Sequence, residues 1–356
     1  MNFIKLISRY AILIGALLCA NSILASEKSS GETEKSGHGS EKFVVGEFII
    51  EHIKDSHEWH IMTRKNGESV KISLPIIVYS FKSGLNFFMS GKLSHGKVYN
   101  GFMIPEEGEH SGKIVEINEQ EEITGIPLDF SITKTVAGMM FAALIILVLF
   151  IRMGRIYSGK TKIVPGGLNG FLEPMIIFIR DEIALPNIGR HKYEKYMPYL
   201  LTVFFFILVN NIMGLIPFFP FGANVTGNIA VTMLLALITF IITQFSGSKD
   251  HWKHIVAAPG VPVWLAPIMI PVEVIGLFTK PFALMIRLFA NITAGHIVIL
   301  SLICLIFIFK QLWVSTLAIP MVLFLDILEI LVAFLQAYVF TLLSALFIGL
   351  AAKEHH

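Results

Sequence analysis

The sequence predicts an all-α polytopic membrane protein that carries a small β-rich domain outside the membrane near its N-terminus. Of its 356 residues, 54% are hydrophobic and 15% are charged, and the mean hydropathy is +0.70. Soluble domains carry about a quarter charged residues. Beyond residue 133, apolar runs recur that are long enough to cross a bilayer as helices. The net charge of +2 does not favour nucleic acid as a partner, and the two cysteines form no metal-thiolate pattern.

Residues 1–25 have the pattern of a secretory signal peptide. Lys5 and Arg9 form a positive end before an apolar stretch, and a small residue, Ala25, marks the cleavage site. The alternative is an uncleaved first membrane helix. Residues 26–42 are rich in Ser, Gly, Glu and Lys, and this composition predicts a disordered linker.

Residues 43–130 predict a small β-rich external domain, because short β-type runs alternate with turn residues. Residues 59–63 and 70–74 flank Asn66-Gly67, which indicates a hairpin. The segment 52–60 contains three histidines and two acids. Zinc is conceivable there, but the spacing matches no established ligand pattern. We therefore expect a solvated strand edge and no metal.

Residues 131–356 predict a membrane domain of about five transmembrane helices. Clusters of Lys and Arg follow the first and third spans, which places these loops inside under the positive-inside rule. The N-terminal domain is then on the outer, periplasmic side of a bacterial cell inner membrane, and the C-terminus is cytoplasmic. The predicted spans lie near residues 133–152, 197–217, 228–246, 281–309 and 317–351.

Two apolar segments between the spans are predicted not to cross. Residues 166–196 are amphipathic and predict a helix at the inner surface, followed by a basic loop through Arg190, Lys192 and Lys195. Residues 264–279 contain two prolines and are expected to dip into the inner leaflet or pack sideways. Within the last two spans, the apolar runs at residues 282–309 and 321–351 would be about 42 and 46 Å long as helices, which exceeds the hydrocarbon thickness of about 30 Å. These two long helices must tilt, kink or protrude.

Arg287 is the most informative single residue, because a guanidinium keeps its charge inside the membrane. At the centre of a spanning helix it costs about 2.5–3.5 kcal/mol on insertion scales. Such a residue persists when it faces a partner, a water-filled cavity or another subunit. The alternative is an arginine that snorkels from a helix end, but Arg287 lies six residues beyond Pro281.

Polar residues on the last two spans can be paired by helix geometry. Glu329 and Gln336 share one face, because they are seven residues apart. In an antiparallel pair, Gln336 lies level with Arg287 when Glu329 lies level with His296. The arrangement gives an acid–imidazole pair in the outer half of the membrane and an arginine–amide pair near its middle. Further polar residues lie near the arginine's face (Asn291), in the outer cluster (Asp326) and on the inner side (Glu273 and Lys280).

Two polar half-paths offset around a fixed positive charge would suit a proton relay. The alternative is a buried polar network that only locks two helices together. An imidazole on the path favours protons over sodium as the coupling ion.

These residues belong to blocks that closely resemble subunit a of F-type ATP synthases. The resemblance covers about residues 133–356. It implies that Arg287 is the essential stator arginine, that Gln336 and Asn291 are its neighbours, and that His296 and Glu329 form the outer half-channel pair. Gly214 stands where some bacterial members have an aspartate. The matching blocks are residues 287–296, 327–329 and 335–343, Lys280-Pro281, and residues 209–217, from which we also place Asn211 on the proton path.

The resemblance implies a proton-translocating stator that is not an enzyme on its own and binds neither nucleotide nor cofactor. Its implied partners are the c-ring, a peripheral stalk of the subunit b type, the remaining synthase subunits, membrane lipid and protons. The alternative is a secondary ion transporter or a channel that acts alone. A transporter would show internal repeats, and the sequence has no second copy of the 287–296 block.

Overall fold

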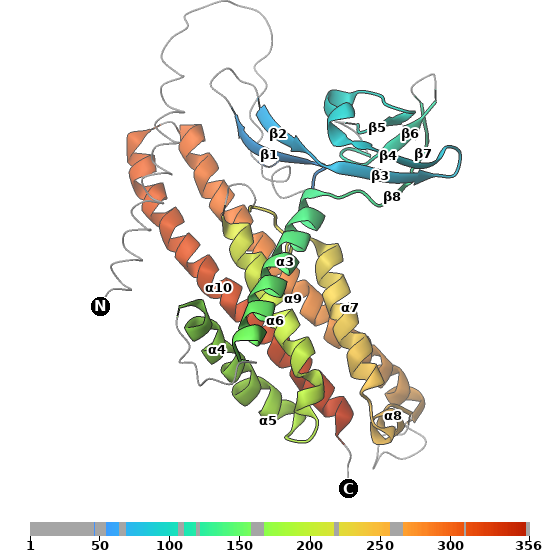
Figure 1. Ribbon diagram of the computed structural model, residues 1–356, viewed down its shortest axis with the longest axis vertical. Helices are drawn as coiled ribbons and strands as arrows, with labels where there is room; N and C mark the ends of the chain where they lie inside the picture. The colour runs from blue at the N-terminus through green and yellow to red at the C-terminus, as the bar shows by residue number, and fades with distance from the viewer. Residues whose placement is uncertain are drawn as a thin grey trace, which may run out of the picture. The chain divides into compact units, whose positions relative to one another are not determined.

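The computed structural model describes Gly46 and residues 55–63, 69–105, 110–118, 122–157, 167–216, 221–256, 266–309 and 311–353. In this part of the chain, strands occupy the N-terminal region and helices follow from Lys134 onward (Figure 1). The predicted signal peptide, linker and Asn66-Gly67 turn lie outside the described residues.

The N-terminal region folds as three small antiparallel sheets. The first is the hairpin of β1 and β2, in which Glu58 pairs with Ser73, so the predicted hairpin is confirmed. The second has the order β4-β3-β8, and the third has the order β5-β6-β7. The strands are β1 (Glu58–Thr63), β2 (Ser69–Ser73), β3 (Pro75–Ser80), β4 (Gly84–Met89), β5 (Phe102–Met103), β6 (Val115–Ile117), β7 (Ile123–Gly125) and β8 (Leu128–Asp129), with short 3-10 helices η2 (Ser90–Lys92) and η3 (Ser94–Gly96) between β4 and β5.

The core of this β domain follows from the two-residue period of a strand. Ile76 and Val78 of β3 and Phe88 of β4 point to one face, where they are buried against Phe102 and Ile114. Phe88 and Phe102 stack with their ring centroids 6.1 Å apart. The domain therefore has a core of its own on one face of the β4-β3-β8 sheet.

The strand β8 leads directly into α3 (Lys134–Tyr157), and the start of this helix is held by the segment before β1. The backbone N–H of Lys134 donates to the carbonyl of Ser56 at 2.9 Å. The backbone N–H of Thr135 donates to Oδ1 of Asp55 at 3.0 Å. The first N–H groups of a helix have no partner within the helix, and a carboxylate also complements the helix dipole. Asp55 therefore caps α3 from outside the helix.

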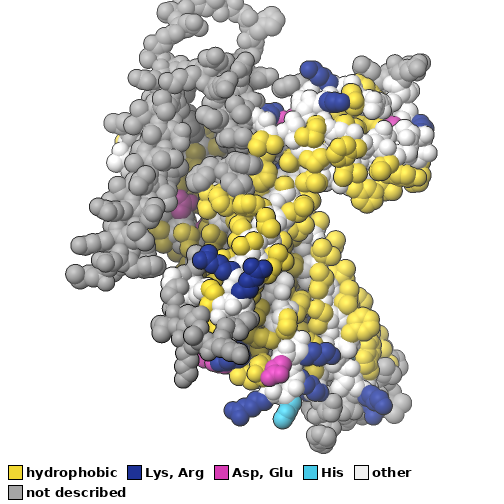
Figure 2. All heavy atoms as spheres, viewed as in Figure 1, with side chains coloured by type: hydrophobic (Ala, Val, Ile, Leu, Met, Phe, Trp, Pro, Cys, Tyr) yellow, Lys and Arg dark blue, Asp and Glu magenta, His cyan; other side chains and the backbone are white. Residues whose placement is uncertain are grey.

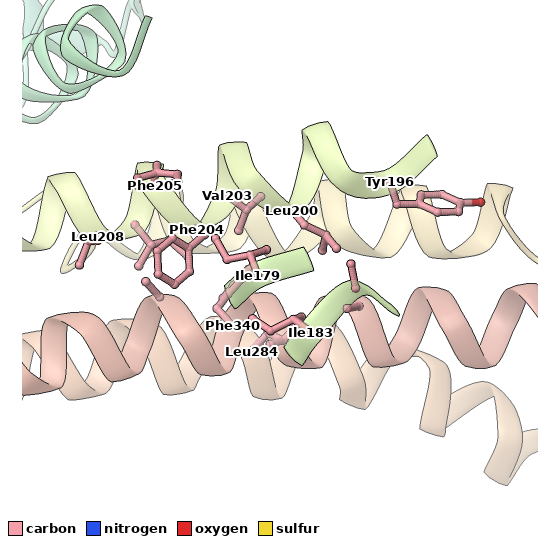
Figure 3. Packing of buried hydrophobic residues seen from close by; sticks show 14 of the residues in the cluster. Ile179, Ile183, Tyr196, Leu200, Val203, Phe204, Phe205, Leu208, Leu284 and Phe340 are labelled. Atoms are coloured by element: carbon pink, nitrogen blue, oxygen red, sulfur yellow. The ribbon is translucent and has the colours of Figure 1, made fainter. Parts of the chain in front are cut away.

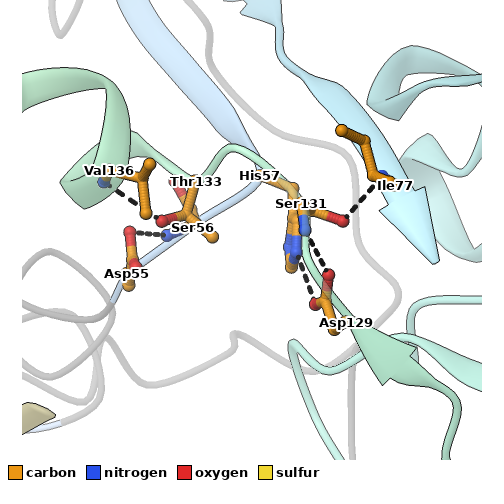
Figure 4. Close-up of polar contacts among 8 residues, drawn as sticks. All are labelled: Asp55, Ser56, His57, Ile77, Asp129, Ser131, Thr133 and Val136. Carbon is orange, nitrogen blue, oxygen red and sulfur yellow. Dashed lines mark hydrogen bonds and ion pairs between the residues drawn. The ribbon is translucent and has the colours of Figure 1, made fainter. Parts of the chain in front are cut away.

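A second polar cluster joins β8 to the same segment (Figure 4). Oδ2 of Asp129 lies 3.3 Å from Nε2 of His57, and Oδ1 accepts a hydrogen bond from the backbone N–H of Ser131 at 2.8 Å. Partial burial alone would raise the pKa of Asp129, but the hydrogen bonds from His57 and Ser131 outweigh burial and hold this pKa below its ordinary value. Asp129 is therefore held in its ionised form.

The helical region confirms a polytopic helical membrane protein. Four described helices, α3, α6, α9 and α10, are long and apolar enough to cross a membrane. The third predicted span corresponds to α7, which has 17 residues and is shorter than the other four. The described helices that follow α3 are α4 (Leu168–Phe178), the π-helical turn η4 (Ile179–Ala184), α5 (Leu185–Ile188), α6 (Tyr193–Leu215), α7 (Ile229–Phe245), α8 (Lys249–Val256), α9 (Ala266–Phe309) and α10 (Leu312–Ala352).

The prediction of a separate segment at residues 264–279 was wrong over its described part. Residues 266–309 form one helix of 44 residues, with Pro271 and Pro281 inside it. Each proline removes one backbone hydrogen bond. Ending the helix in apolar surroundings would leave several polar backbone groups without partners, so continuing the helix costs less. At helical rise α9 is about 66 Å long, so it is longer still than the predicted span.

The amphipathic segment at residues 166–196 is helical over α4, η4 and α5, but its apolar side packs against other helices. Ile179 and Ile183 are fully buried with Leu200 and Phe204 of α6 and Phe340 of α10 (Figure 3). The predicted basic loop is shorter than expected, because Lys195 belongs to α6. The segment therefore contributes to the helical core.

Candidate functional site

The polar residues that the sequence singled out gather where α9 and α10 meet. Nδ1 of His296 on α9 lies 3.6 Å from Oε1 of Glu329 on α10. The side chains are only 18% and 13% exposed, so water screens this contact poorly. The expected proximity of His296 and Glu329 is thus observed. Their roles remain predictions.

The second contact between these helices joins two amides. Nδ2 of Asn291 donates to Oε1 of Gln336 at 3.0 Å, and Gln336 is buried. This differs from the arginine–amide pair that the sequence predicted, because no hydrogen bond between Arg287 and Gln336 is found among the described residues. The register explains the difference: with His296 opposite Glu329, Gln336 lies level with a point midway between Arg287 and Asn291. Nε2 of Gln336 is buried and has no partner in the described part of the chain.

Arg287 lies on an exposed part of α9. Within the described residues its guanidinium makes no hydrogen bond and no ion pair. Arg287, Asn291 and Gly295 follow at four-residue intervals and share one face of the helix. The positive charge of Arg287 therefore lies on the face of α9 that contacts α10. No described side chain of α10 forms an ion pair with it.

The continuity of α9 aligns two further charges with Arg287. Glu273 and Lys280 precede it at intervals of seven residues, so all three follow nearly one line along the helix. Lys280 is exposed, and its Nζ lies 5.7 Å from the centroid of the Phe347 ring on α10. Sequence reasoning missed this alignment, because it ended the preceding segment before Pro281.

Beside Lys280, a cavity of about 70 Å³ lies between α7, α9 and α10. Its lining includes the polar side chains of Thr243, Gln244 and Lys280. Oε1 of Gln244 is buried without a partner among the described residues. Through Lys280 the cavity lies on the same line of α9 as Arg287, about 10 Å away at helical rise.

The helix α6 closes the other side of the His296–Glu329 pair. Asn211 is buried, accepts a hydrogen bond from Oγ1 of Thr226 at 2.5 Å, and donates to the carbonyl of Ala333 on α10 at 3.4 Å. A side chain at Gly214, one turn further, would place its Cβ 3.9 Å from Nε2 of His296. Three helices therefore surround the imidazole. Thr226 is a residue of this site that sequence reasoning did not identify.

Two more residues of α9 and α10 shape the pair. Asp326 is half-buried one turn before Glu329, within electrostatic range of both Glu329 and His296. A Cβ built at Gly295 would collide with Oε1 of Glu329. Gly295 therefore makes room for the carboxylate of Glu329. The sequence feature that could have indicated this role is the position of a glycine directly before the histidine.

The segment 52–60 contributes to structure in its described part. His57 contacts Asp129, and Glu58 forms an ion pair with Lys71 at 2.8 Å. Among the described residues no group of three or more His, Cys, Asp or Glu side chains could hold a metal ion. The structure does not describe the side chains of His52 and His60.

Comparisons with known proteins divide the chain at the start of α3. Residues 136–349 match the family model described as ATP synthase A chain, and residues 48–130 match a domain of unknown function (DUF8433). The ATP synthase subunit a of Chloroherpeton thalassium is 51% identical over 235 residues, which are 64% of this chain and 69% of the relative.

Two further relatives come from other bacteria. The ATP synthase subunit a of Myxococcus xanthus is 50% identical over 246 residues, which cover 66% of this chain and 79% of that protein. The ATP synthase subunit a of Anaeromyxobacter sp. is 44% identical over 252 residues, which cover 68% and 60%. From residue 136 to residue 349, the chain therefore belongs to the ATP synthase A chain family, the family of subunit a of the F-type ATP synthase membrane sector.

Proposed function

We propose that this chain is the proton-translocating stator of an ATP synthase, with two offset half-paths that Arg287 keeps apart. One observation carries the proposal: a permanent positive charge lies exposed on a membrane helix and has no partner among the described residues. A charge in this position needs a partner outside the chain. A carboxylate of the c-ring has the chemistry to face it.

The outer half-path runs past His296, Glu329, Asp326 and Asn211 toward the level of Arg287. Imidazole and carboxylate groups exchange protons near neutral pH, and the 3.6 Å separation suits transfer directly or through one water. The β domain then lies on the outer, periplasmic side of the bacterial inner membrane, and the C-terminus is cytoplasmic.

The inner half-path uses Glu273, Lys280 and the small cavity that Lys280 lines. A ring carboxylate that has received a proton from the outer path is neutral and can turn into lipid, where a charged group is costly. On its return it meets Arg287, which favours the ionised form, and it releases its proton to the inner path. The direction of proton flow through the two half-paths then sets the direction in which the ring turns.

The proposal leaves all nucleotide chemistry to other subunits, so this chain is not an enzyme on its own. The stator must be held against the turning ring, which requires a peripheral stalk of the subunit b type. Asn291 and Gln336 hold α9 and α10 in register beside Arg287, and they thereby position the charge. The ring, the stalk, the remaining synthase subunits and the lipid are the partners.

Two measurements on the tagged full chain test the proposal. Purification in mild detergent should recover a small membrane protein with a carboxylate in an apolar segment. Vesicles with Arg287→Lys should lose ATP-driven proton pumping while ATP hydrolysis continues, because an ammonium lacks the fixed charge and the planar fork. Ion transport by the purified chain alone would instead support a transporter or channel and would contradict the proposal.

A further inference from the structure

The β4-β3-β8 sheet buries apolar side chains on one face and exposes apolar side chains on the other, whereas an antiparallel sheet on a domain surface usually has a polar outer face. One face carries Ile76, Val78 and Phe88 into the core of the β domain.

The outward face is formed by three rows of cross-strand neighbours. Tyr79 of β3 lies between Leu85 and Leu128, and Ile77 lies between Phe87 and Phe130. In the third row Pro75 lies between Met89 and Ile132. None of the nine residues is charged. We call this set the apolar sheet face: Pro75, Ile77, Tyr79, Leu85, Phe87, Met89, Leu128, Phe130 and Ile132.

This face is uncovered in the described structure. Leu85 is 70% exposed, Phe87 69% and Phe130 64%. Figure 2 shows hydrophobic side chains gathered along one side of the β domain. Soluble surfaces rarely expose an apolar patch of this kind, and such a patch usually marks an interaction site.

The chain itself indicates what covers the face. Ile132, in the third row, lies two residues before Lys134, where α3 begins. The helix has 24 residues and is about 36 Å long, slightly more than the hydrocarbon thickness of about 30 Å. The third row therefore starts in the headgroup region, and the first row lies only about 14 Å further along the strand.

The composition of the face agrees with this position. Tyr side chains gather at the level of lipid headgroups, and Phe and Leu side chains form the buried side of segments that lie in the interface. The face supplies Tyr79, Phe87 and Phe130 together with Leu85 and Leu128. At the tip of the β3–β4 hairpin, Phe81 is 84% exposed and is followed by the exposed Lys82. An exposed ring beside a lysine fits the boundary between acyl chains and anionic headgroups.

We propose that the apolar sheet face lies in the bilayer interface, on the side of the membrane where α3 begins. The β domain is then a peripheral membrane module fixed by two attachments, the polar contacts of Asp55 with α3 and the apolar sheet face on lipid. The proposal concerns residues 75–132, and it does not depend on how protons cross the membrane domain.

Fluorescence quenching of a bimane label tests this on the full chain, with Cys19 and Cys304 replaced by alanine. The label is placed by Phe87→Cys, in vesicles of phosphatidylcholine and phosphatidylglycerol. Matched controls are Lys113→Cys, at an exposed polar position of the same domain, and Leu147→Cys, at an exposed apolar position of α3. The quenchers are iodide in water and lipids with a nitroxide at a shallow or a deep acyl position.

The proposal predicts that shallow nitroxide lipids quench the Phe87 label and that iodide quenching is lost relative to the Lys113 label. Deep nitroxide lipids should quench the Leu147 label best. Quenching of the Phe87 label by iodide as at Lys113 would overturn the proposal. So would protection from both quenchers, in vesicles or in the complex purified from native membranes, because protein would then cover the face. If Phe87→Cys disturbs folding, Leu85→Cys on the same face gives the same comparison.

Discussion

Nδ1 of His296 on α9 lies 3.6 Å from Oε1 of Glu329 on α10. If the two side chains handle the proton as one unit, His296→Ala and Glu329→Ala should each reduce proton flux, and the double substitution should cost far less than their sum. We expect a coupling free energy of about 1–3 kcal/mol, as for residues in one network. The exchange of both residues should retain more flux than either half-exchange, since two imidazoles or two acids repel when charged.

The measurement is ATP-driven proton flux in vesicles for the single, double and exchanged variants. Ser301→Ala serves as the control, because the hydroxyl of Ser301 donates to the carbonyl of Ile297 within its own helix and has no other partner among the described residues. The two residues would be shown to act separately if the flux losses of the single variants added up in the double variant and the full exchange retained no more flux than either half-exchange.

Gly295 sets the position of the Glu329 carboxylate. A methyl group in Gly295→Ala would meet Oε1 of Glu329 and push the carboxylate away from His296. We expect proton flux to fall about 10- to 100-fold, the range for small displacements of a reacting group.

The control is Gly214→Ala, whose Cβ has room, at 3.9 Å from His296 and 3.5 Å from the carbonyl oxygen of Ala223. It should retain most of the flux in the same vesicles. Equal flux in both variants would mean that the carboxylate position does not limit transfer.

The hydrogen bond from Asn291 to Gln336 should hold α9 and α10 in register. A double-mutant cycle with Asn291→Ala and Gln336→Ala should give a coupling of about 0.6 kcal/mol in the free energy of unfolding, typical of hydrogen bonds between membrane helices. Unfolding in mixed micelles measures it. The same cycle with Ser301→Ala in place of Gln336→Ala should show no coupling, and a zero value for both cycles would remove the bond as a source of stability.

The β domain should lose stability in acid because of Asp129. Its folded-state pKa is lowered by His57 and Ser131, so its stabilising effect is complete above the unfolded value of 3.8 and is lost as the pH falls through the lower folded value. Asp129→Asn should remove this part of the pH dependence. Hydrogen exchange of β3 and β8 in the full chain at a series of pH values measures this stability. If the loss of stability in acid were the same in Asp129→Asn, Asp129 would not be its cause.

The class of fold could be predicted from the sequence, because the bilayer requires long apolar helices and a β hairpin has a turn signature. The continuity of α9 through Pro281 could not be predicted, because the prolines indicated a separate segment before this residue. Proline ends helices in water, where freed backbone groups bind solvent, and it is tolerated in α9, where ending the helix would cost more.

The candidate site was predicted in part. The His296–Glu329 proximity was predicted from the helix period, the antiparallel direction of the two spans and the resemblance to the family. The partner of Gln336 was missed, because Gln336 lies level with a point midway between Arg287 and Asn291, so its depth along the helix does not choose between them. The role of Gly295 depends on a contact between two helices, so only the packed structure reveals it.

In the proposed function, Arg287 prevents protons from running directly between the two half-paths. The passive proton conductance of vesicles measures this most directly, after the nucleotide-hydrolysing part has been stripped from them. In Arg287→Ala vesicles we expect a raised passive leak, no ATP-driven pumping before stripping, and a leak that closes again on adding Glu329→Gln. Arg287→Ala vesicles that stay as tight as the unmodified ones and still pump would contradict the account.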